Sequence, residues 1–239
     1  GFILQISPID GTRTAWVSGE QDDVTLHAPK GMAVVDGVLW VADIDVLRQF
    51  DLSSGAQLGD VTIPGATFLS DVSAAPDGTV YCTDAGLDEN FAPTGSDAIW
   101  RIRPDGVPTA LMKTPALGHP MSLVARDGGI YVVSWRDGAF FEVDYRGVRT
   151  ELGVAPQGNL QGLVRVAKAN SKTGNQKFAQ PMWYASSSAG KAIYRFGMTG
   201  AVAAMPMRLE DAAGLGYDSR RNCLLIPLSG SNRVRIEQL

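Results

Sequence analysis

A short pattern of strands and turns recurs along the chain, and this recurrence constrains the fold more than any other feature. Its first copy spans Ala28–Leu52 and has two apolar runs joined by Asp36-Gly37, followed by a third run at Leu47–Leu52. An Asp-Gly pair supplies the positive-φ residues that a tight hairpin turn requires. The unit therefore predicts three antiparallel strands, with room for a fourth before the next copy.

Further copies follow at a spacing of roughly 40–50 residues, which is the period of a four-stranded propeller blade. They begin near Leu69, His119, Leu160 and Ala213. The segment Phe2–Val17 predicts the last two strands of one more unit, and no stretch shows a helical period. We therefore expect an all-β propeller, with residues 1–239 as a single domain. The expected type is six-bladed with one blade incomplete; the alternative is a closed five-bladed ring.

Composition and charge exclude several function classes. The formal net charge of −4 gives no basic footprint for nucleic acid, and no apolar run is long enough for a transmembrane helix. Cys82 and Cys223 fall on predicted strands of different copies, so we expect two buried, unpaired thiols. The first residues contain no basic leader. We expect a monomer in the periplasm or outside the cell, with the cytoplasm as the alternative.

Polar side chains gather at one end of the predicted blades. In this topology the first strand of each copy starts, and the second ends, on the face where propellers commonly bind ligands. The residues that we expect to bind a ligand there are Lys30, Asp43, Asp71, Asp84, His119, Trp135 and Gln161. The long loop Ala85–Asp97 extends from the same face, and Lys168–Pro181 extends from the opposite one. Lys30 beside an aspartate favours a polar, anionic small molecule.

Several of these residues have a simpler structural interpretation. Asp43 and Asp84 can accept hydrogen bonds from backbone N–H groups of their own loops. Lys30 and Asp71 can neutralise each other. His119 is a candidate general base, although a hydrogen-bonded loop histidine is the simpler interpretation. Two histidines cannot form a histidine metal cluster, and no Gly-x-Ser-x-Gly motif is present to hold a nucleophilic serine.

The first copy resembles NHL-type propeller repeats in its segments 29–34, 38–43 and 48–52. Over nearly the whole chain the pattern resembles the senescence-marker-protein/gluconolactonase family, which includes regucalcin. This resemblance implies a β-propeller that binds a divalent metal, typically calcium, at the top of the central channel and hydrolyses lactones. In that family the metal ligands are acidic or Asn residues at the starts of the innermost strands.

The positions that match these ligands carry no carboxylate in this chain. They are Lys30, Ser70, Pro120, Gln161 and Ala213. Calcium requires several oxygen ligands, usually with carboxylates among them. We therefore expect no cofactor, and a propeller that binds a small polar ligand or a protein partner. The alternative is a calcium-dependent lactonase-like hydrolase whose rearranged ligands are Asp71, Asp84 and Asp211.

Overall fold

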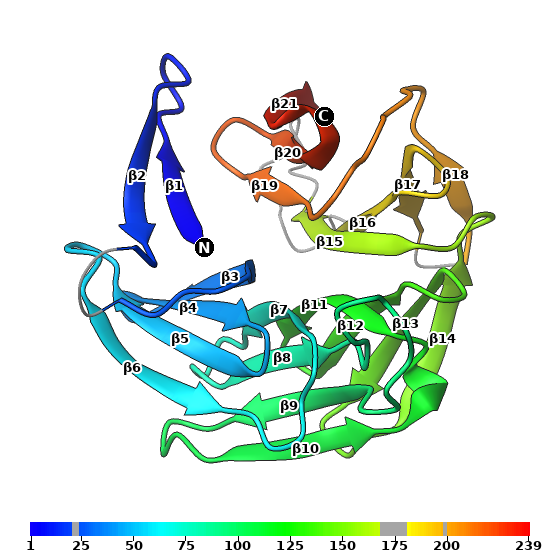
Figure 1. Ribbon diagram of the computed structural model, residues 1–239. Helices are drawn as coiled ribbons and strands as arrows, with labels where there is room; N and C mark the ends of the chain where they lie inside the picture. Colours follow the sequence, from blue (N-terminus) through cyan, green and yellow to red (C-terminus); the bar gives the residue numbers. More distant parts are fainter. Residues whose placement is uncertain (21–23, 168–180, 198–199) are drawn as a thin grey trace. The chain divides into compact units, whose positions relative to one another are not determined.

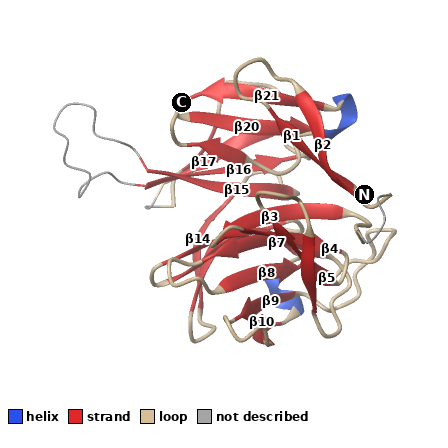
Figure 2. Ribbon diagram, turned by 90° about the vertical axis from the view of Figure 1, so that its left-hand side faces the viewer, coloured by secondary structure: helices blue, strands red, loops and turns tan. Residues whose placement is uncertain are grey.

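The computed structural model describes residues 1–20, 24–167, 181–197 and 200–239, and their regular structure is almost entirely β-strand (Figures 1 and 2). The strands are β1 (Phe2–Ile6), β2 (Arg13–Ser18), β3 (Pro29–Val35), β4 (Val38–Asp43), β5 (Val46–Asp51), β6 (Gln57–Thr62), β7 (Leu69–Ala74), β8 (Val80–Asp84), β9 (Ala98–Ile102), β10 (Pro108–Lys113), β11 (Pro120–Arg126), β12 (Gly129–Ser134), β13 (Ala139–Asp144), β14 (Arg149–Val154), β15 (Leu160–Ala167), β16 (Pro181–Ser187), β17 (Ala192–Phe196), β18 (Val202–Ala204), β19 (Gly216–Asp218), β20 (Cys223–Leu228) and β21 (Arg233–Gln238). Two short 3-10 turns, η1 (Pro115–Leu117) and η3 (Ser229–Ser231), accompany them.

Consecutive strands pair antiparallel, so each sheet is a meander (Figure 1). Among the described strands, β3–β6, β7–β10, β11–β14 and β15–β18 form four-stranded sheets, β19–β21 form a three-stranded sheet, and β1 pairs with β2. Asp36 and Gly37 both have positive φ, at 47° and 80°, as the hairpin between β3 and β4 requires. The predicted four-stranded antiparallel repeats are therefore confirmed.

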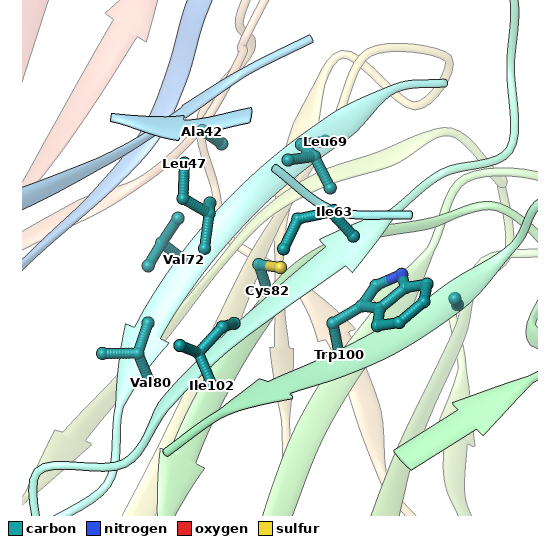
Figure 3. Close-up of a cluster of buried hydrophobic side chains, with 10 residues drawn as sticks. Ala42, Leu47, Ile63, Leu69, Val72, Val80, Cys82, Trp100 and Ile102 are labelled. Atoms are coloured by element: carbon teal, nitrogen blue, oxygen red, sulfur yellow. The ribbon is translucent and has the colours of Figure 1, made fainter. Parts of the chain in front are cut away.

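The chain divides into two compact units, Gly1–Ala116 and Leu117–Leu239. In the first unit, sheets β3–β6 and β7–β10 share an apolar core that includes Leu47, Leu69, Val72, Cys82 and Trp100 (Figure 3). A second cluster packs β1 and β2 against β3–β6. Burial of these alternating side chains supplies the main driving force for each sheet pair.

The second unit has an aromatic core between β11–β14 and β15–β18. The rings of Tyr131 and Trp183 stack with centroids 4.3 Å apart. Phe140 lies 5.4 Å from Trp183 and 5.0 Å from Phe196, which extends the cluster across both sheets. Offset aromatic contacts of this kind add to the free energy of burial, so this cluster fixes one blade against the next.

Two glycines allow neighbouring first strands to approach closely. A Cβ on Gly31 of β3 would lie 2.1 Å from Oδ1 and 2.4 Å from Cα of Asp71 in β7. A Cβ on Gly162 of β15 would lie 2.3 Å from the backbone nitrogen of Leu215. Each glycine directly follows a predicted site residue, Lys30 or Gln161. These two side chains are therefore placed where the backbones of adjacent blades meet.

Both cysteines are buried and unpaired, as the sequence predicts. Burial raises the pKa of the Cys82 thiol, so the reactive thiolate is strongly disfavoured. No helix among the described residues is long and apolar enough to cross a membrane.

Candidate functional site

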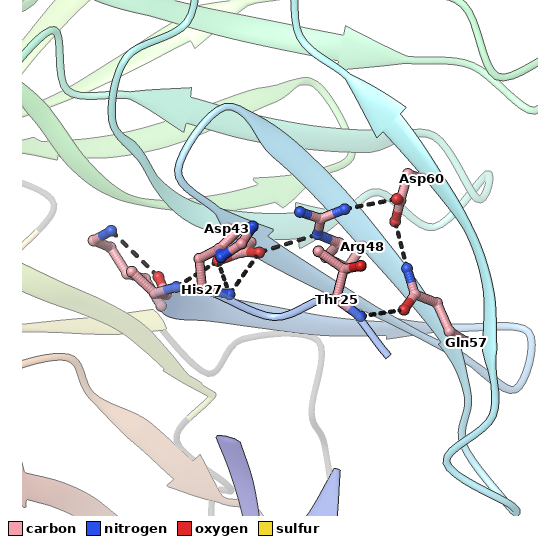
Figure 4. Close-up of polar contacts among 8 residues, drawn as sticks. Thr25, His27, Asp43, Arg48, Gln57 and Asp60 are labelled. Atoms are coloured by element: carbon pink, nitrogen blue, oxygen red, sulfur yellow. Dashed lines mark hydrogen bonds and ion pairs between the residues drawn. The ribbon is translucent and has the colours of Figure 1, made fainter. Parts of the chain in front are cut away.

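Asp43 fixes the chain segment that leads into β3. Its side chain is fully buried at the end of β4, and Oδ1 accepts hydrogen bonds from the backbone N–H groups of His27 at 3.0 Å and Ala28 at 2.6 Å (Figure 4). Arg48 Nε donates to Oδ2 at 3.0 Å, and Arg48 Nη1 contacts Asp60 at 2.6 Å. This network positions Ala28 and, two residues later, Lys30.

Opposing effects set the pKa of both buried partners. Burial raises the pKa of Asp43. Hydrogen bonds from His27, Ala28 and Arg48 lower it by more than burial raises it, so the net shift is downward. Burial lowers the pKa of Arg48, but its contacts with Asp43 and Asp60 outweigh burial and raise the pKa overall. Both side chains therefore carry their charge at neutral pH.

Asp84 has the same role in the next blade. Its side chain is fully buried at the end of β8, and Oδ1 accepts N–H groups of Phe68 and Gly86, both at 3.0 Å. In β15–β18 a serine takes this position: Ser187 Oγ donates to the Gly158 carbonyl at 2.7 Å and accepts Gly190 N–H at 2.9 Å. These are the loop-fixing bonds that the sequence offers as the alternative role of Asp43 and Asp84.

Lys30 is a half-buried cation with an aromatic neighbour. Its Nζ lies 4.2 Å from the centroid of the Phe68 ring and 3.4 Å from the Ala28 carbonyl oxygen. Burial lowers the pKa of Lys30, and the charge of Asp43 opposes that shift. Among the described residues no carboxylate lies within ion-pair distance of Lys30 Nζ. An ammonium group has three donors, so Lys30 has hydrogen-bonding capacity beyond the single carbonyl that it contacts.

The loop Ala85–Asp97 extends this aromatic surface. The rings of Phe68 and Phe91 lie 5.7 Å apart, and Phe91 is 55% exposed. The loop holds its own shape, because Asp88 N–H donates to the Ala92 carbonyl at 2.9 Å and Thr94 N–H donates to the Gly86 carbonyl at 2.8 Å. Lys30, Phe68 and Phe91 thus form a continuous row in the first unit.

Asp71 lies beside the strand that carries Lys30. Its Oδ1 is next to Gly31, and the same oxygen accepts the N–H of Val72 at 2.9 Å. The neighbouring strand residue, Ser70, shares a hydrogen bond with Thr83 at 2.9 Å. Lys30, Asp43 and Asp71 therefore occupy adjoining positions in the first unit.

In the second unit the structure brings three predicted residues into one hydrogen-bonded region. His119 is 4% exposed with a φ of 60°, and its ring centroid lies 6.2 Å from that of Trp135. The Trp135 carbonyl accepts the N–H of Asn159 at 2.6 Å. Gln161 Nε2 donates to Ser188 Oγ at 3.2 Å, and Ser188 N–H donates to the Asn159 carbonyl at 3.2 Å.

The alternative calcium ligands do not fit a cation. Among the described residues no three His, Cys, Asp or Glu side chains gather closely enough to hold a metal ion. Asp84 directs its oxygens at backbone N–H donors, and Asp71 Oδ1 accepts Val72 N–H. Asp211 lies in the second unit beside Gly230, in a turn with a φ of 54°. Calcium requires several oxygens whose lone pairs converge on one point.

Solved structures of known proteins cover most of this chain. A virginiamycin B lyase from Staphylococcus aureus matches with a TM-score of 0.67 at 16% identity, over 100% of this chain and 73% of that chain. A gluconolactonase from Xanthomonas campestris gives 0.67 at 19% identity, over 91% of this chain and 72% of that chain. A nidogen–laminin complex gives 0.65 at 15% identity, over 95% and 84%. The chain is a β-propeller.

The matching structures are six-bladed propellers, and the predicted similarity to gluconolactonases holds at the level of structure. At these identities the similarity establishes the fold alone. Neither the comparison with protein-family profiles nor that with curated proteins gives a match.

Sequence reasoning missed the two aromatic members of the row beside Lys30. Phe68 directly precedes β7 and Phe91 lies at the tip of a loop, so neither belongs to the alternating pattern of a strand. The only available signal was the unusual length of the loop. The basic stretch predicted on the opposite face lies, over residues 168–180, outside the described part of the propeller.

Proposed function

We propose that this propeller is a binding protein for a small organic acid, and that Lys30 supplies the cationic contact. One observation carries the proposal: the Lys30 ammonium group is half-buried against Phe68, without a carboxylate in ion-pair distance among the described residues. A charge removed from water without a partner is costly. A bound carboxylate would offset that cost with a charge-assisted hydrogen bond.

The aromatic row defines the rest of the proposed ligand. The Phe68 ring already contacts the ammonium group, and the exposed Phe91 ring lies beside it. An apolar or sugar-like body attached to the carboxylate would lie along these rings. The ligand that suits this surface therefore has one anionic end and one weakly polar end.

Lactone hydrolysis is the competing function, and the arrangement of the carboxylates argues against it. Asp84 is committed to backbone N–H groups, and the described residues contain no cluster of metal ligands. The matching structures include a lyase, a gluconolactonase and a component of a nidogen–laminin complex, so the fold itself does not select an activity.

Substitution of Lys30 tests the proposal with a closely matched control. Lys113 also places its Nζ over an aromatic ring, 5.8 Å from the Trp100 centroid, but it is exposed on β10. Sugar acids, their lactones and small aromatic acids are screened by isothermal titration calorimetry. For any acid that binds, Lys30→Met should weaken affinity by about tenfold to a hundredfold, because a hydrogen bond to a charged group contributes roughly 1.5–3 kcal/mol. Lys113→Met should leave affinity unchanged.

Two results would overturn this proposal. One is acid binding that Lys30→Met leaves intact. The other is calcium-dependent turnover of a lactone that Asp71→Asn abolishes, which would establish the hydrolase instead.

A further inference from the structure

The second unit contains a pocket at the opposite ends of its strands from His119 and Gln161. The pocket has a volume of about 240 Å³. Its lining consists of Arg126, Asp127, Tyr131, Arg165, Pro181 and Trp183. Arg126 ends β11, Tyr131 follows on β12, and Arg165 and Trp183 come from β15 and β16. The pocket therefore lies where the β11–β12 hairpin meets the neighbouring sheet.

Two arginines line this pocket, and neither forms an ion pair with a described carboxylate. Asp127, in the exposed turn after Arg126, is the one acidic side chain in the described lining. Burial lowers the pKa of Arg165, and the like charge of Arg126 lowers it further. The lining thus carries a net positive charge although the whole chain has a net charge of −4. Like charges held together in this way are unfavourable unless an anion lies between them.

One wall of the pocket contains a buried donor. Trp183 is 1% exposed, and its Nε1–H has no hydrogen-bond partner among the described residues. Its ring is held in place by the stacked ring of Tyr131 at 4.3 Å. A buried N–H group without an acceptor is destabilising, and most native N–H groups avoid this.

We propose that this pocket binds a small oxyanion, a phosphate or carboxylate group, with Arg126 and Arg165 as its charge partners. A guanidinium group presents a planar fork of donors that matches two oxygens of either anion. When both guanidinium groups bind the same anion, its negative charge offsets the repulsion between the two arginines. This site is separate from Lys30 and does not depend on the function proposed for the first unit.

Calorimetry with simple anions tests the site in the full chain. Inorganic phosphate and acetate are titrated at low ionic strength, with chloride as the reference anion. We expect phosphate or acetate to bind more tightly than chloride, and Arg126→Gln or Arg165→Gln to weaken that binding by at least about tenfold. Arg195→Gln removes an exposed charge from β17 of the same sheet, outside the pocket lining, and should not change the affinity.

Additional variants separate the roles within the pocket. Arg165→Lys keeps the positive charge but loses the planar fork of donors, so this variant should bind the anion with intermediate affinity. It also replaces Arg165→Gln in the test if the glutamine variant does not fold. Phosphate titrations repeated in a Lys30→Met background assign the binding that remains to this pocket and not to the organic-acid site. Absence of phosphate and acetate binding at millimolar concentration, or equal binding by both glutamine variants and the unmodified protein, would overturn the proposal.

Discussion

Replacing Asp43 with Asn tests whether the buried network in front of β3 stabilises the first unit. An asparagine has nearly the same shape as an aspartate, but one of its oxygens becomes an NH₂ group. Asp43 uses both oxygens as acceptors, for His27 N–H, Ala28 N–H and Arg48 Nε. The substitution therefore points an NH₂ group at a hydrogen-bond donor and removes the fully buried counter-charge of Arg48.

The expected loss of stability follows from burial. The Asp43 side chain is fully buried and that of Arg48 is 9% exposed. Removing one partner of a buried pair typically destabilises a protein by about 3–5 kcal/mol. Because Asp60 remains as a second, partly exposed counter-charge of Arg48, we expect a loss at the lower end of this range. The control is Asp60→Asn, because Asp60 contacts the same arginine at 2.6 Å with a side chain that is 36% exposed. Solvent screens that contact, so the expected loss is about 1 kcal/mol or less.

Urea unfolding followed by circular dichroism measures both variants. The free energy of unfolding is taken from the transition midpoint and slope, and the slope also shows whether the first unit unfolds separately. Equal losses for Asp43→Asn and Asp60→Asn would refute the reasoning, because burial would then not determine the cost.

The pH dependence gives an independent check. The folded pKa of Asp43 lies below its unfolded value of about 3.9, so its contribution to stability is fully present above that value. This contribution is lost as the pH falls through the folded pKa. Stability of the unmodified protein should therefore decrease more steeply in acid than that of Asp43→Asn.

Two further predictions concern the core. Gly162→Ala should destabilise the propeller by about 1–3 kcal/mol in the same urea assay, because its Cβ would lie 2.3 Å from the backbone nitrogen of Leu215. Gly59→Ala, with no atom near its Cβ, should be neutral or slightly stabilising, and equal effects of both alanines would contradict the close approach. Cys82 and Cys223 should react with a thiol reagent only as fast as the protein opens, so rapid labelling of the native protein would show that they are not buried.

The sheets could be predicted from the sequence because their signals are local. Alternating apolar residues mark each strand, and a turn such as Asp36-Gly37 marks the hairpin between two strands. These signals all lie within a short stretch of sequence. The loop-fixing alternative for Asp43 and Asp84 was also predictable, since both end a strand at the start of a loop. The side-chain environment of Lys30 was not, because Phe68 and Phe91 reach it through a different blade. Arg126 and Arg165 likewise meet across two sheets, and no spacing rule links residues so far apart in the chain.

The hydrogen bonds of Asp43, Asp84 and Ser187 bear on how such a chain can change its length in evolution. Each side chain fixes a loop of its own repeat: Asp43 holds His27, Asp84 holds Phe68, and Ser187 holds Gly158. A duplicated gene segment that encodes one repeat therefore contains both the strand end and the loop that it secures. Only the contacts between repeats, such as that of Gly31 with Asp71, must be matched anew after duplication.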